Sequence, residues 1–341
     1  MEPLQTFLDD PLRVLRTIRF ATRFNFTMVE ELHEAIQDAK IKDALAVKVS
    51  YERIGKETDQ MMSGKNPERS VNYFYDYKLF SHLLKFPKSC EELQEQEKVD
   101  ELTYSSLKVC DILGRCFSAI KKDGSLMSIE WPSGDELSEV QKYTFYAGIL
   151  VPFRNYQHTV KKAQNEKVEG VHNFVMFESL KQPTKGKNFV HKCLSHLDDI
   201  IKHVISEEFD VVEVGILLKE LEECSDAGFL LALATEYYNT YLVDQQSDID
   251  QEKLTEMMNK YEAFYQKVKD HKIDHAHLIK PLMNGKDIMK LYDVKGGPFM
   301  KQVCDEVFKW QLVHPDGQED ELKEYMIENK KKFKNVQPKQ K

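Results

Sequence analysis

Turn-forming residues and cysteine motifs are scarce in this sequence. Only 14 Gly and 11 Pro occur among 341 residues, whereas Glu, Lys, Leu and Met are plentiful, and this balance favours helix. The six cysteines form no CxxC pair, so we expect reduced thiols in an intracellular protein. No apolar run reaches the roughly 18 residues of a membrane span, and the opening residues MEPLQTFLDD are neither a signal peptide nor an Arg-rich transit peptide.

An excess of positive charge is also missing. The chain has 48 Lys and Arg against 57 Asp and Glu, a net charge of -9, which argues against a uniformly basic nucleic-acid binder. A local basic face is still allowed, because attraction depends on where the charges lie. There is no internal repeat and no alternation of strand and helix signals. The sequence therefore predicts an all-α fold built of two or three modules.

We expect three helical modules and a short tail. Residues 1–87 form a neck, 88–243 a body and 244–328 a tail module, and the basic end 329–341 is predicted to be disordered. Predicted helices cover residues 8–25, 28–40, 50–63, 67–85, 101–121, 135–163, 189–206, 209–222, 226–243, 252–270, 285–292 and 298–312. A long loop is expected at KKDGSLMSIEWPSGDE, after residue 120.

The helix predicted at 8–25 carries an unusual arginine stripe. At about 100° per residue, Val14, Leu15, Ile18 and Ala21 share one arc. The opposite arc carries Arg16, Arg19 and Arg23, with Arg13 at its edge, and no acid lies between Arg13 and Arg23. A solvated surface is the ordinary interpretation of such a stripe. Phosphate binding is the alternative, because guanidinium is always charged and binds oxyanions in a bidentate manner.

Asp10 and Arg13 stand three positions apart at the start of this helix. Together they offer an acceptor beside a planar donor. Cytosine and adenine present an exocyclic amine next to a ring acceptor, whereas uracil and guanine present a carbonyl that would face Asp10 acceptor to acceptor. The pair can therefore select C and A over U and G without a nucleic-acid template. A helix cap combined with a salt bridge is the simpler alternative.

The segment FLDDPLRVLRTIRFATRF closely resembles the nucleotide-selecting motif of class II CCA-adding tRNA nucleotidyltransferases and related poly(A) polymerases. The resemblance rests on Asp9, Asp10, Arg13, Arg16, Arg19 and Phe20. It implies that Asp10 and Arg13 act as an amino-acid template for CTP and then ATP. It also implies that Arg16 and Arg19 support this nucleotide-binding site or contact phosphate.

Two further segments are similar to the same family. VSYERIGKE (49–57) resembles its next motif, with Ser50 as a helix cap and with Arg53 and Glu57 as an i,i+4 pair that braces the first helix. A plain surface salt bridge is an equal alternative for that pair. The segment 280–300 resembles the family's tail, where Gly285 and Gly296-Gly297-Pro298 would form turns at helix starts. Such turns either bind phosphate or serve only as helix caps.

The family's metal-binding DxD motif has no convincing counterpart. Asp248-Ile249-Asp250 has the DxD pattern without a strand signal or a Gly-rich partner, and His191, Cys193 and His196 do not share one ligand-ready helix face. The resemblance therefore implies a region without the catalytic palm domain. Mg²⁺ would belong to the complete enzyme and not to this chain, which we expect to be inactive alone, with no catalytic residue and no metal ligand.

The partners implied by the resemblance are tRNA, CTP and ATP, and no membrane. A separate palm-domain chain is one way to complete the enzyme. The location implied is intracellular and cytoplasmic, with the nucleus or mitochondrion open for a full-length member. The alternative function is a non-catalytic helical RNA-binding or interaction protein descended from such an enzyme. A helical scaffold unrelated to RNA is a third possibility.

Overall fold

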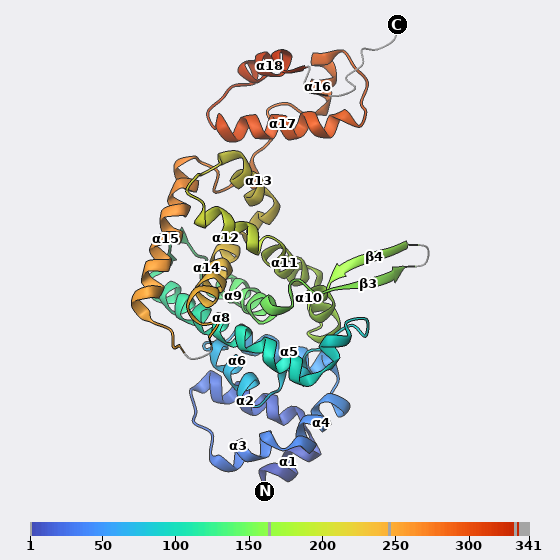
Figure 1. Cartoon of the computed structure of the whole chain (residues 1–341), viewed down its shortest axis with the longest axis vertical. Coiled ribbons are helices and arrows are strands. Elements are labelled where there is room, and N and C mark those ends of the chain that lie inside the picture. Colours follow the sequence, from blue (N-terminus) through green and yellow to red (C-terminus); the bar gives the residue numbers. More distant parts are fainter. Residues whose placement is uncertain (1, 163–164, 245–246, 331–332, 334–341) are drawn as a thin grey trace. The chain divides into compact units, whose positions relative to one another are not determined.

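The computed structural model describes residues 2–162, 165–244, 247–330 and 333. It divides into two compact units, Met1–Ile201 with Asp226–Tyr261, and Lys202–Ser225 with Glu262–Lys341. Most of the described residues are helical (Figure 1), which confirms the predicted fold class. Most of the predicted disordered end lies outside the described residues. Among the described residues, no helix is both long and apolar enough to cross a membrane.

The first unit contains most of the helices and both hairpins. Its α-helices are α1 (Pro3–Asp9), α2 (Leu12–Phe24), α3 (Glu30–Gln37), α4 (Ala39–Lys48), α5 (Tyr51–Met62), α6 (Pro67–Asp76), α7 (Phe80–Leu83), α8 (Gln96–Asp123), α9 (Gly134–Leu150), α10 (Val171–Phe174) and α11 (Thr184–Ser195). Shorter turns are η1 (Glu91–Gln94), η2 (Val151–Phe153) and the π-helix η3 (Val175–Ser179). The strands are β1 (Ser125–Leu126), β2 (Ile129–Glu130), β3 (Gln157–Lys162) and β4 (Asn165–Gly170).

The remaining helices lie in the second unit or belong to both. Helices α12 (Leu197–Ile205), α14 (Ser225–Tyr241) and α15 (Gln251–Asp270) contain residues of both units. The second unit holds α13 (Val211–Leu221), η4 (Glu222–Cys224), η5 (Ala276–Leu278), α16 (Gly285–Tyr292), α17 (Phe299–Val313) and α18 (Glu319–Glu328). Helices α16, α17 and α18 share an apolar core that includes Ile288, Val303, Trp310 and Leu322.

The arginine helix is shorter than predicted. Asp10 is extended, with φ -142° and ψ 94°, so the predicted helix 8–25 is divided into α1 and α2. Pro11 precedes α2 and supplies a helical φ of -61° without needing a hydrogen-bond acceptor. Asn25 ends α2 in the left-handed region at φ 55°, as the sequence predicted. Val14, Leu15 and Ile18 are fully buried, which orients the arginine stripe toward the opposite face.

Several other predicted helices were wrong in their extent, including 189–206, which is divided at His196. Asp38 interrupts 28–40 and caps α4 through its carboxylate, 2.7 Å from the Lys40 amide. The segment 67–85 is divided at Lys78, which has a φ of 53°. The predicted helix 135–163 ends at Leu150, because Pro152 lacks the N–H that would continue it.

Two antiparallel hairpins replace segments predicted as loop or helix. The first pairs Leu126 with Ile129 inside the predicted long loop. The second pairs Gln157 with Gly170 at its base and projects from the helices of the first unit (Figure 1). Because only a few residues in each hairpin pair with each other, both remain small additions to a helical body.

Close packing positions α5 within the first unit. Helix α8 packs against α6 and α9, and α2 packs against α5 and α6. Gly55 of α5 lies against the backbone at Leu180, where a Cβ would come within 2.4 Å of the Leu180 carbonyl oxygen. This approach leaves no room for a side chain. Helix α5 is therefore held between α2 on one side and the end of η3 on the other.

Candidate nucleotide and RNA site

Glu57 of α5 joins two arginines of the stripe. Its carboxylate accepts hydrogen bonds from Arg16 Nε at 3.0 Å and from Arg19 Nε at 2.7 Å. The Arg19 and Glu57 side chains are only 12% and 10% exposed, whereas Arg16 is half exposed. Each charged group is paired, which offsets the cost of removing it from water. Arg19 is thus held in place, and Arg16 keeps an open side.

Arg53, one turn before Glu57, reaches the start of α2. Its Nη2 lies 3.2 Å from Asp10 Oδ1 and 3.4 Å from Oδ2. Asp10 Oδ1 also accepts from the Leu12 amide at 3.3 Å. A carboxylate has about four lone-pair sites, so Asp10 keeps acceptor capacity toward solvent. The structure therefore orients Asp10 from two sides and leaves it accessible.

Arg13 remains beside Asp10 but points its guanidinium to a different group. Its backbone amide bonds to the Asp10 carbonyl at 3.0 Å, and its Nη1 donates to the Thr6 carbonyl at 3.2 Å. The side chain is exposed. Asp10 and Arg13 are therefore neighbours in the structure. The ion pair of Asp10, however, is with Arg53, which lies 43 positions later in the sequence.

Arg53 and Glu57, expected as an i,i+4 pair, each have a partner outside α5. Arg53 bonds to Asp10, and Glu57 bonds to Arg16 and Arg19. Both residues brace the arginine helix, through separate contacts. Spacing within α5 could not show this, because the partners lie 38 to 43 positions earlier in the chain.

A row of three exposed aromatic rings follows the arginines, and only the first, Phe20, belongs to the motif found in the sequence. Phe20 stacks on Phe24 with ring centroids 6.0 Å apart, and Phe24 stacks on Phe26 at 5.5 Å. All three are exposed. The guanidinium of Arg19 lies 4.3 Å from the Phe20 ring centroid, which is a cation–π distance. Exposed aromatics beside arginine are a sequence-independent platform for nucleobases.

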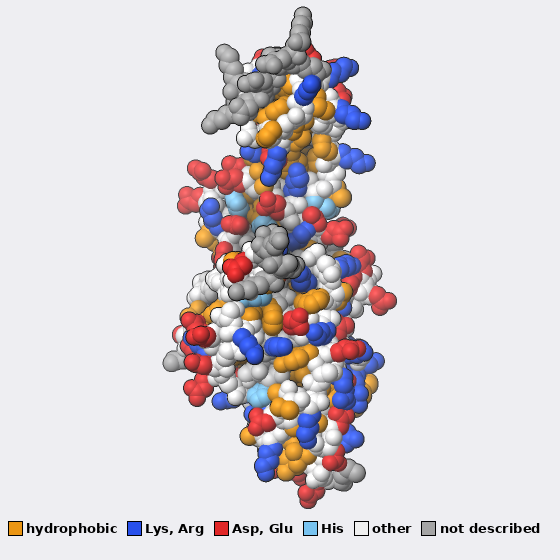
Figure 2. Space-filling view, turned by 90° about the vertical axis from the view of Figure 1, so that its right-hand side faces the viewer, with side chains coloured by type: hydrophobic (Ala, Val, Ile, Leu, Met, Phe, Trp, Pro, Cys, Tyr) orange, Lys and Arg blue, Asp and Glu red, His pale blue; other side chains and the backbone are white. Residues whose placement is uncertain are grey.

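A basic cavity of about 670 Å³ opens next to the arginine stripe. Four cations line it, and no acidic side chain is among its lining residues, which are Arg19, Arg23, Gln60, Ser63, Gly64, Lys65, Lys121 and Ser138. On the face of the chain shown in Figure 2, many Lys and Arg side chains are interspersed with Asp and Glu. The cavity is therefore a local concentration of positive charge in an acidic protein.

Two of the candidate metal ligands make other contacts. Asp250 is the N-terminal cap of α15, where its Oδ1 accepts from the amides of Glu252 and Lys253 at 2.9 and 3.3 Å. His191 accepts or donates at 2.9 Å to the buried His172. Among the residues that the structure describes, no cluster of three His, Cys, Asp or Glu could hold a metal ion. The carboxylate of Asp250 is therefore used as a helix cap.

Both predicted tail turns stand at helix starts. Gly285 is the first residue of α16, and Asn284 forms a capping box with Asp287 there. Pro298 precedes α17 directly after Gly297. The Asn284 side chain accepts from the amides of Lys286 and Asp287, so the helix-cap interpretation is sufficient for α16.

The sequence of the chain is similar to those of known proteins. Residues 25–90 match a family model described as a probable RNA and SrmB-binding site of polymerase A. The chain is 26% identical over 330 residues to the tRNA nucleotidyltransferase cca2 of Schizosaccharomyces pombe, covering 96% of this chain and 61% of that protein. It is 28% identical over 337 residues to the mitochondrial CCA tRNA nucleotidyltransferase of Saccharomyces cerevisiae, covering 93% of this chain and 59% of that protein.

Over most of its length the chain is similar in sequence to proteins named CCA tRNA nucleotidyltransferase. It spans about three fifths of the length of these curated relatives. Its fold is similar to that of a Thermotoga maritima CCA-adding enzyme complexed with tRNA, with a TM-score of 0.55 and 17% identity, covering 96% of this chain and 62% of that one. A CCA-adding enzyme bound to CTP gives a TM-score of 0.54 at the same identity, covering 96% of this chain and 61% of that one. At these identities the structural likeness concerns the fold alone.

Proposed function

We propose that this chain is the nucleotide-selecting and tRNA-binding region of a CCA-adding enzyme. The observation that carries the proposal is the bracing of α2 by α5. Arg53 contacts Asp10, and Glu57 contacts Arg16 and Arg19. Such a network holds the start of α2 and its arginines in a fixed geometry, and a selector needs fixed geometry because a base differs from its competitor by one hydrogen-bonding group.

Selection would use the open sides of Asp10 and Arg13. Asp10 accepts a hydrogen bond from the exocyclic amine of cytosine or adenine, and Arg13 donates to the neighbouring ring nitrogen. A uracil or guanine carbonyl at the same position would leave Asp10 facing another acceptor. A site built around such a hydrogen bond rejects the wrong partner because its polar groups are left unpaired.

RNA binding would use the surface beyond the selector. Arg19, Arg23, Lys65 and Lys121 line the basic cavity and supply phosphate contacts. The rings of Phe20, Phe24 and Phe26 supply stacking that tolerates any base. Phosphate contacts release counterions, so this binding must weaken steeply as salt is raised.

Fluorescence anisotropy with labelled tRNA tests RNA binding by the chain. We expect saturable binding at 50 mM KCl that weakens by at least tenfold at 200 mM, since each phosphate contact adds about 0.9 to the salt slope. A helical scaffold unrelated to RNA would show no saturable binding at low salt. If the chain binds tRNA but Asp10→Ala changes nucleotide selection in no assay, the non-catalytic RNA-binding alternative is favoured.

The bond-forming step is proposed to need a palm domain in addition to these residues. Two-metal nucleotidyl transfer uses carboxylates that hold Mg²⁺ near the 3′-hydroxyl and the triphosphate. We expect the 341-residue chain, incubated with tRNA lacking CCA, CTP, ATP and Mg²⁺, to incorporate no CMP. Joining it to the palm domain of a relative is expected to give addition of C and A, and incorporation by the chain alone would refute this part.

A further inference from the structure

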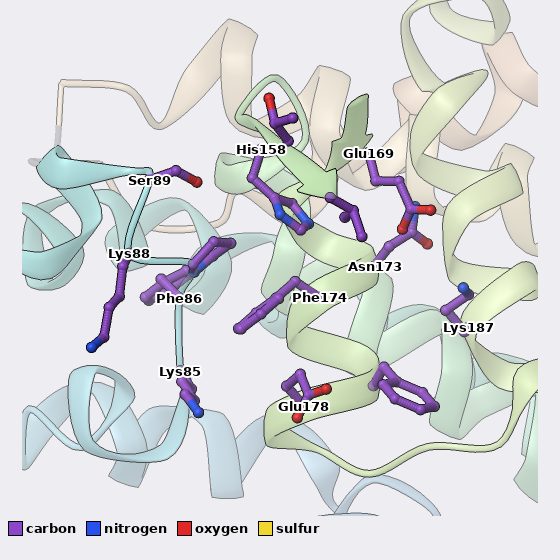
Figure 3. A pocket seen from close by; sticks show the side chains of 14 residues that line it. Lys85, Phe86, Lys88, Ser89, His158, Glu169, Asn173, Phe174, Glu178 and Lys187 are labelled. Atoms are coloured by element: carbon purple, nitrogen blue, oxygen red, sulfur yellow. The ribbon is translucent and has the colours of Figure 1, made fainter. Parts of the chain in front are cut away.

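A second cavity in the first unit is separate from the arginine helix. It has a volume of about 700 Å³ and lies between the 85–89 segment, strand β3 and the α10–η3 helix. Figure 3 shows Phe86, Phe174 and His158 directed into the same space from these three elements. The volume is within the usual range for a small-ligand pocket, about 300–1,000 Å³.

Aromatic rings form the apolar walls of this cavity. Phe86 is buried, Phe174 is half-buried, and Phe177 is 57% exposed at the opening. The imidazole of His158 meets the Phe174 ring edge to face, with centroids 5.3 Å apart. Flat aromatic walls of this kind suit a planar ligand that stacks on them.

Two buried polar atoms in the lining have no partner among the described residues. They are Nε2 of His158 and Oδ1 of Asn173, and both residues are only 8% exposed. Asn173 Nδ2 lies 3.4 Å from His191 Nδ1, which assigns the amide nitrogen to that side. Burial lowers the pKa of His158, so its imidazole is neutral at pH 7 and can donate or accept according to its tautomer. Buried polar atoms are normally satisfied by protein groups or water, so each of these two can take a hydrogen-bond partner from outside the protein.

The charged groups around the opening are predominantly positive. Lys85, Lys88 and Lys187 line the cavity. The two acids in the lining are each paired with a lysine outside it: Glu169 with Lys167 at 3.2 Å, and Glu178 with Lys181 at 3.1 Å. The three lining lysines therefore set the sign of the local field and favour an anion.

We propose that this cavity binds one ribonucleotide unit, with its base against the phenylalanine rings and its phosphate beside Lys85 and Lys88. His158 and Asn173 then complete their hydrogen bonds with the edge of the base. The proposal rests on the RNA-binding function proposed above and adds a base pocket outside the arginine helix. A free nucleotide and a nucleotide within RNA share this chemistry, and the experiment includes both.

Anisotropy with two labelled hexaribonucleotides tests the pocket. One carries bases, and the other is abasic with the same phosphates. Phe177→Ala removes an exposed ring and is not expected to affect folding, and Val47→Ala removes an exposed side chain outside the cavity. We expect Phe177→Ala to weaken binding of the base-containing RNA roughly tenfold, the size of one lost base–aromatic contact. Phe177→Ala should bind the abasic RNA as tightly as the unchanged chain does. Val47→Ala should bind both RNAs as tightly as the unchanged chain does.

Lys88→Ala tests the phosphate contact. Lys48→Ala, which removes another exposed lysine, is its control. Lys88→Ala is expected to weaken both oligonucleotides by a similar factor and to reduce the salt slope by about 1. Titration with AMP and CMP shows whether the cavity also binds a free nucleotide. If it does, Phe177→Ala should bind AMP and CMP more weakly than the unchanged chain. Equal affinity of Phe177→Ala and the unchanged chain for every base-containing ligand would overturn the pocket. A lower salt slope of RNA binding in Arg23→Ala, with Phe177→Ala unaffected, would leave the proposed function intact and reject only this inference.

Discussion

Arg53 Nη2 lies 3.2 Å from Asp10 Oδ1, although the two residues are 43 positions apart in the sequence. The contact connects the residue that we propose to read the base with a helix that is itself fixed by close packing at Gly55. Helix α5 therefore supports the residues of the proposed selector. Its two contacts with α2, at Asp10 and at the Arg16–Arg19 pair, can be tested separately.

Arg53→Ala should damage selection more than stability. The Asp10–Arg53 ion pair is partly exposed, so its loss is expected to cost less than about 1 kcal/mol in the free energy of unfolding. Asp10 would lose one of the two groups that orient it, and discrimination of CTP from UTP should fall several-fold in a chain joined to a relative's palm domain. Lys56→Ala, which removes an exposed i,i+4 pair with Glu52 on the same helix, is the control and should leave discrimination unchanged.

Glu57→Ala should mainly destabilise the fold. It removes the acceptor of two arginines, one of which is largely buried, and breaking a buried ion pair costs about 3–5 kcal/mol. Glu57→Gln keeps a hydrogen-bond acceptor and should cost less. Urea unfolding followed by circular dichroism measures both. Glu52→Ala, an exposed acid of α5, is expected to shift the midpoint little, and equal effects of Glu52→Ala and Glu57→Ala would contradict the bridging role.

Lys65→Ala and Arg23→Ala should each reduce the salt dependence of tRNA binding. Both side chains line the basic cavity, and loss of one phosphate contact lowers the slope of log K against log salt by about 1. The decrease should be similar for different tRNA sequences, because phosphate contacts carry no sequence information. An unchanged slope in both variants, measured by anisotropy, would exclude the cavity from RNA binding.

Acid should weaken the fold through His172. Burial, followed by the nearby charges of His191 and Lys187, lowers the pKa of His172 from 6.5 to about 4. Below pH 6.5 the unfolded chain binds a proton that the folded chain does not, so the free energy of unfolding falls and levels off near pH 4. At pH 5 this single group accounts for a loss of about 2 kcal/mol relative to pH 7.

A comparison with His172→Gln isolates this contribution. Other groups titrate in the same range, and burial raises the pKa of Asp111 to about 6, which acts in the opposite direction. The difference between the unchanged chain and His172→Gln removes these shared terms. Urea unfolding at pH 7 and pH 5 should show a smaller acid loss in the variant, and the same loss in both proteins would show that His172 does not titrate as described.

Local signals in the sequence located the ends of α2 and α5 but not their contacts. Asn25 and Ser50 end and begin helices where predicted, because their side chains and backbone preferences act within a few residues. The partners of Glu57 and Asp10 lie 38 to 43 positions away and depend on how α2 packs on α5. The hairpin of β3 and β4 was also missed, since its pairing is visible only once α9 has ended at Leu150.

The proposed cavity ligand illustrates the same limit. His158, Asn173 and Phe86 come from a strand, a short helix and a connecting segment, and no spacing in the sequence relates them. Asp10 and Arg13, by contrast, are close in sequence, so their chemistry could be proposed before their geometry was known. Motifs within one helix were readable from the residues, and sites assembled by packing required the structure.

Nucleotide choice by an Asp10→Ala variant tests the central claim most directly. The chain is joined to the palm domain of a relative, and incorporation of CMP, AMP, UMP and GMP into tRNA lacking CCA is measured with and without the substitution. The account predicts that Asp10→Ala lowers the preference for C and A by at least tenfold while tRNA affinity is retained. Unchanged selectivity with normal incorporation would contradict the role of α2 as the selector.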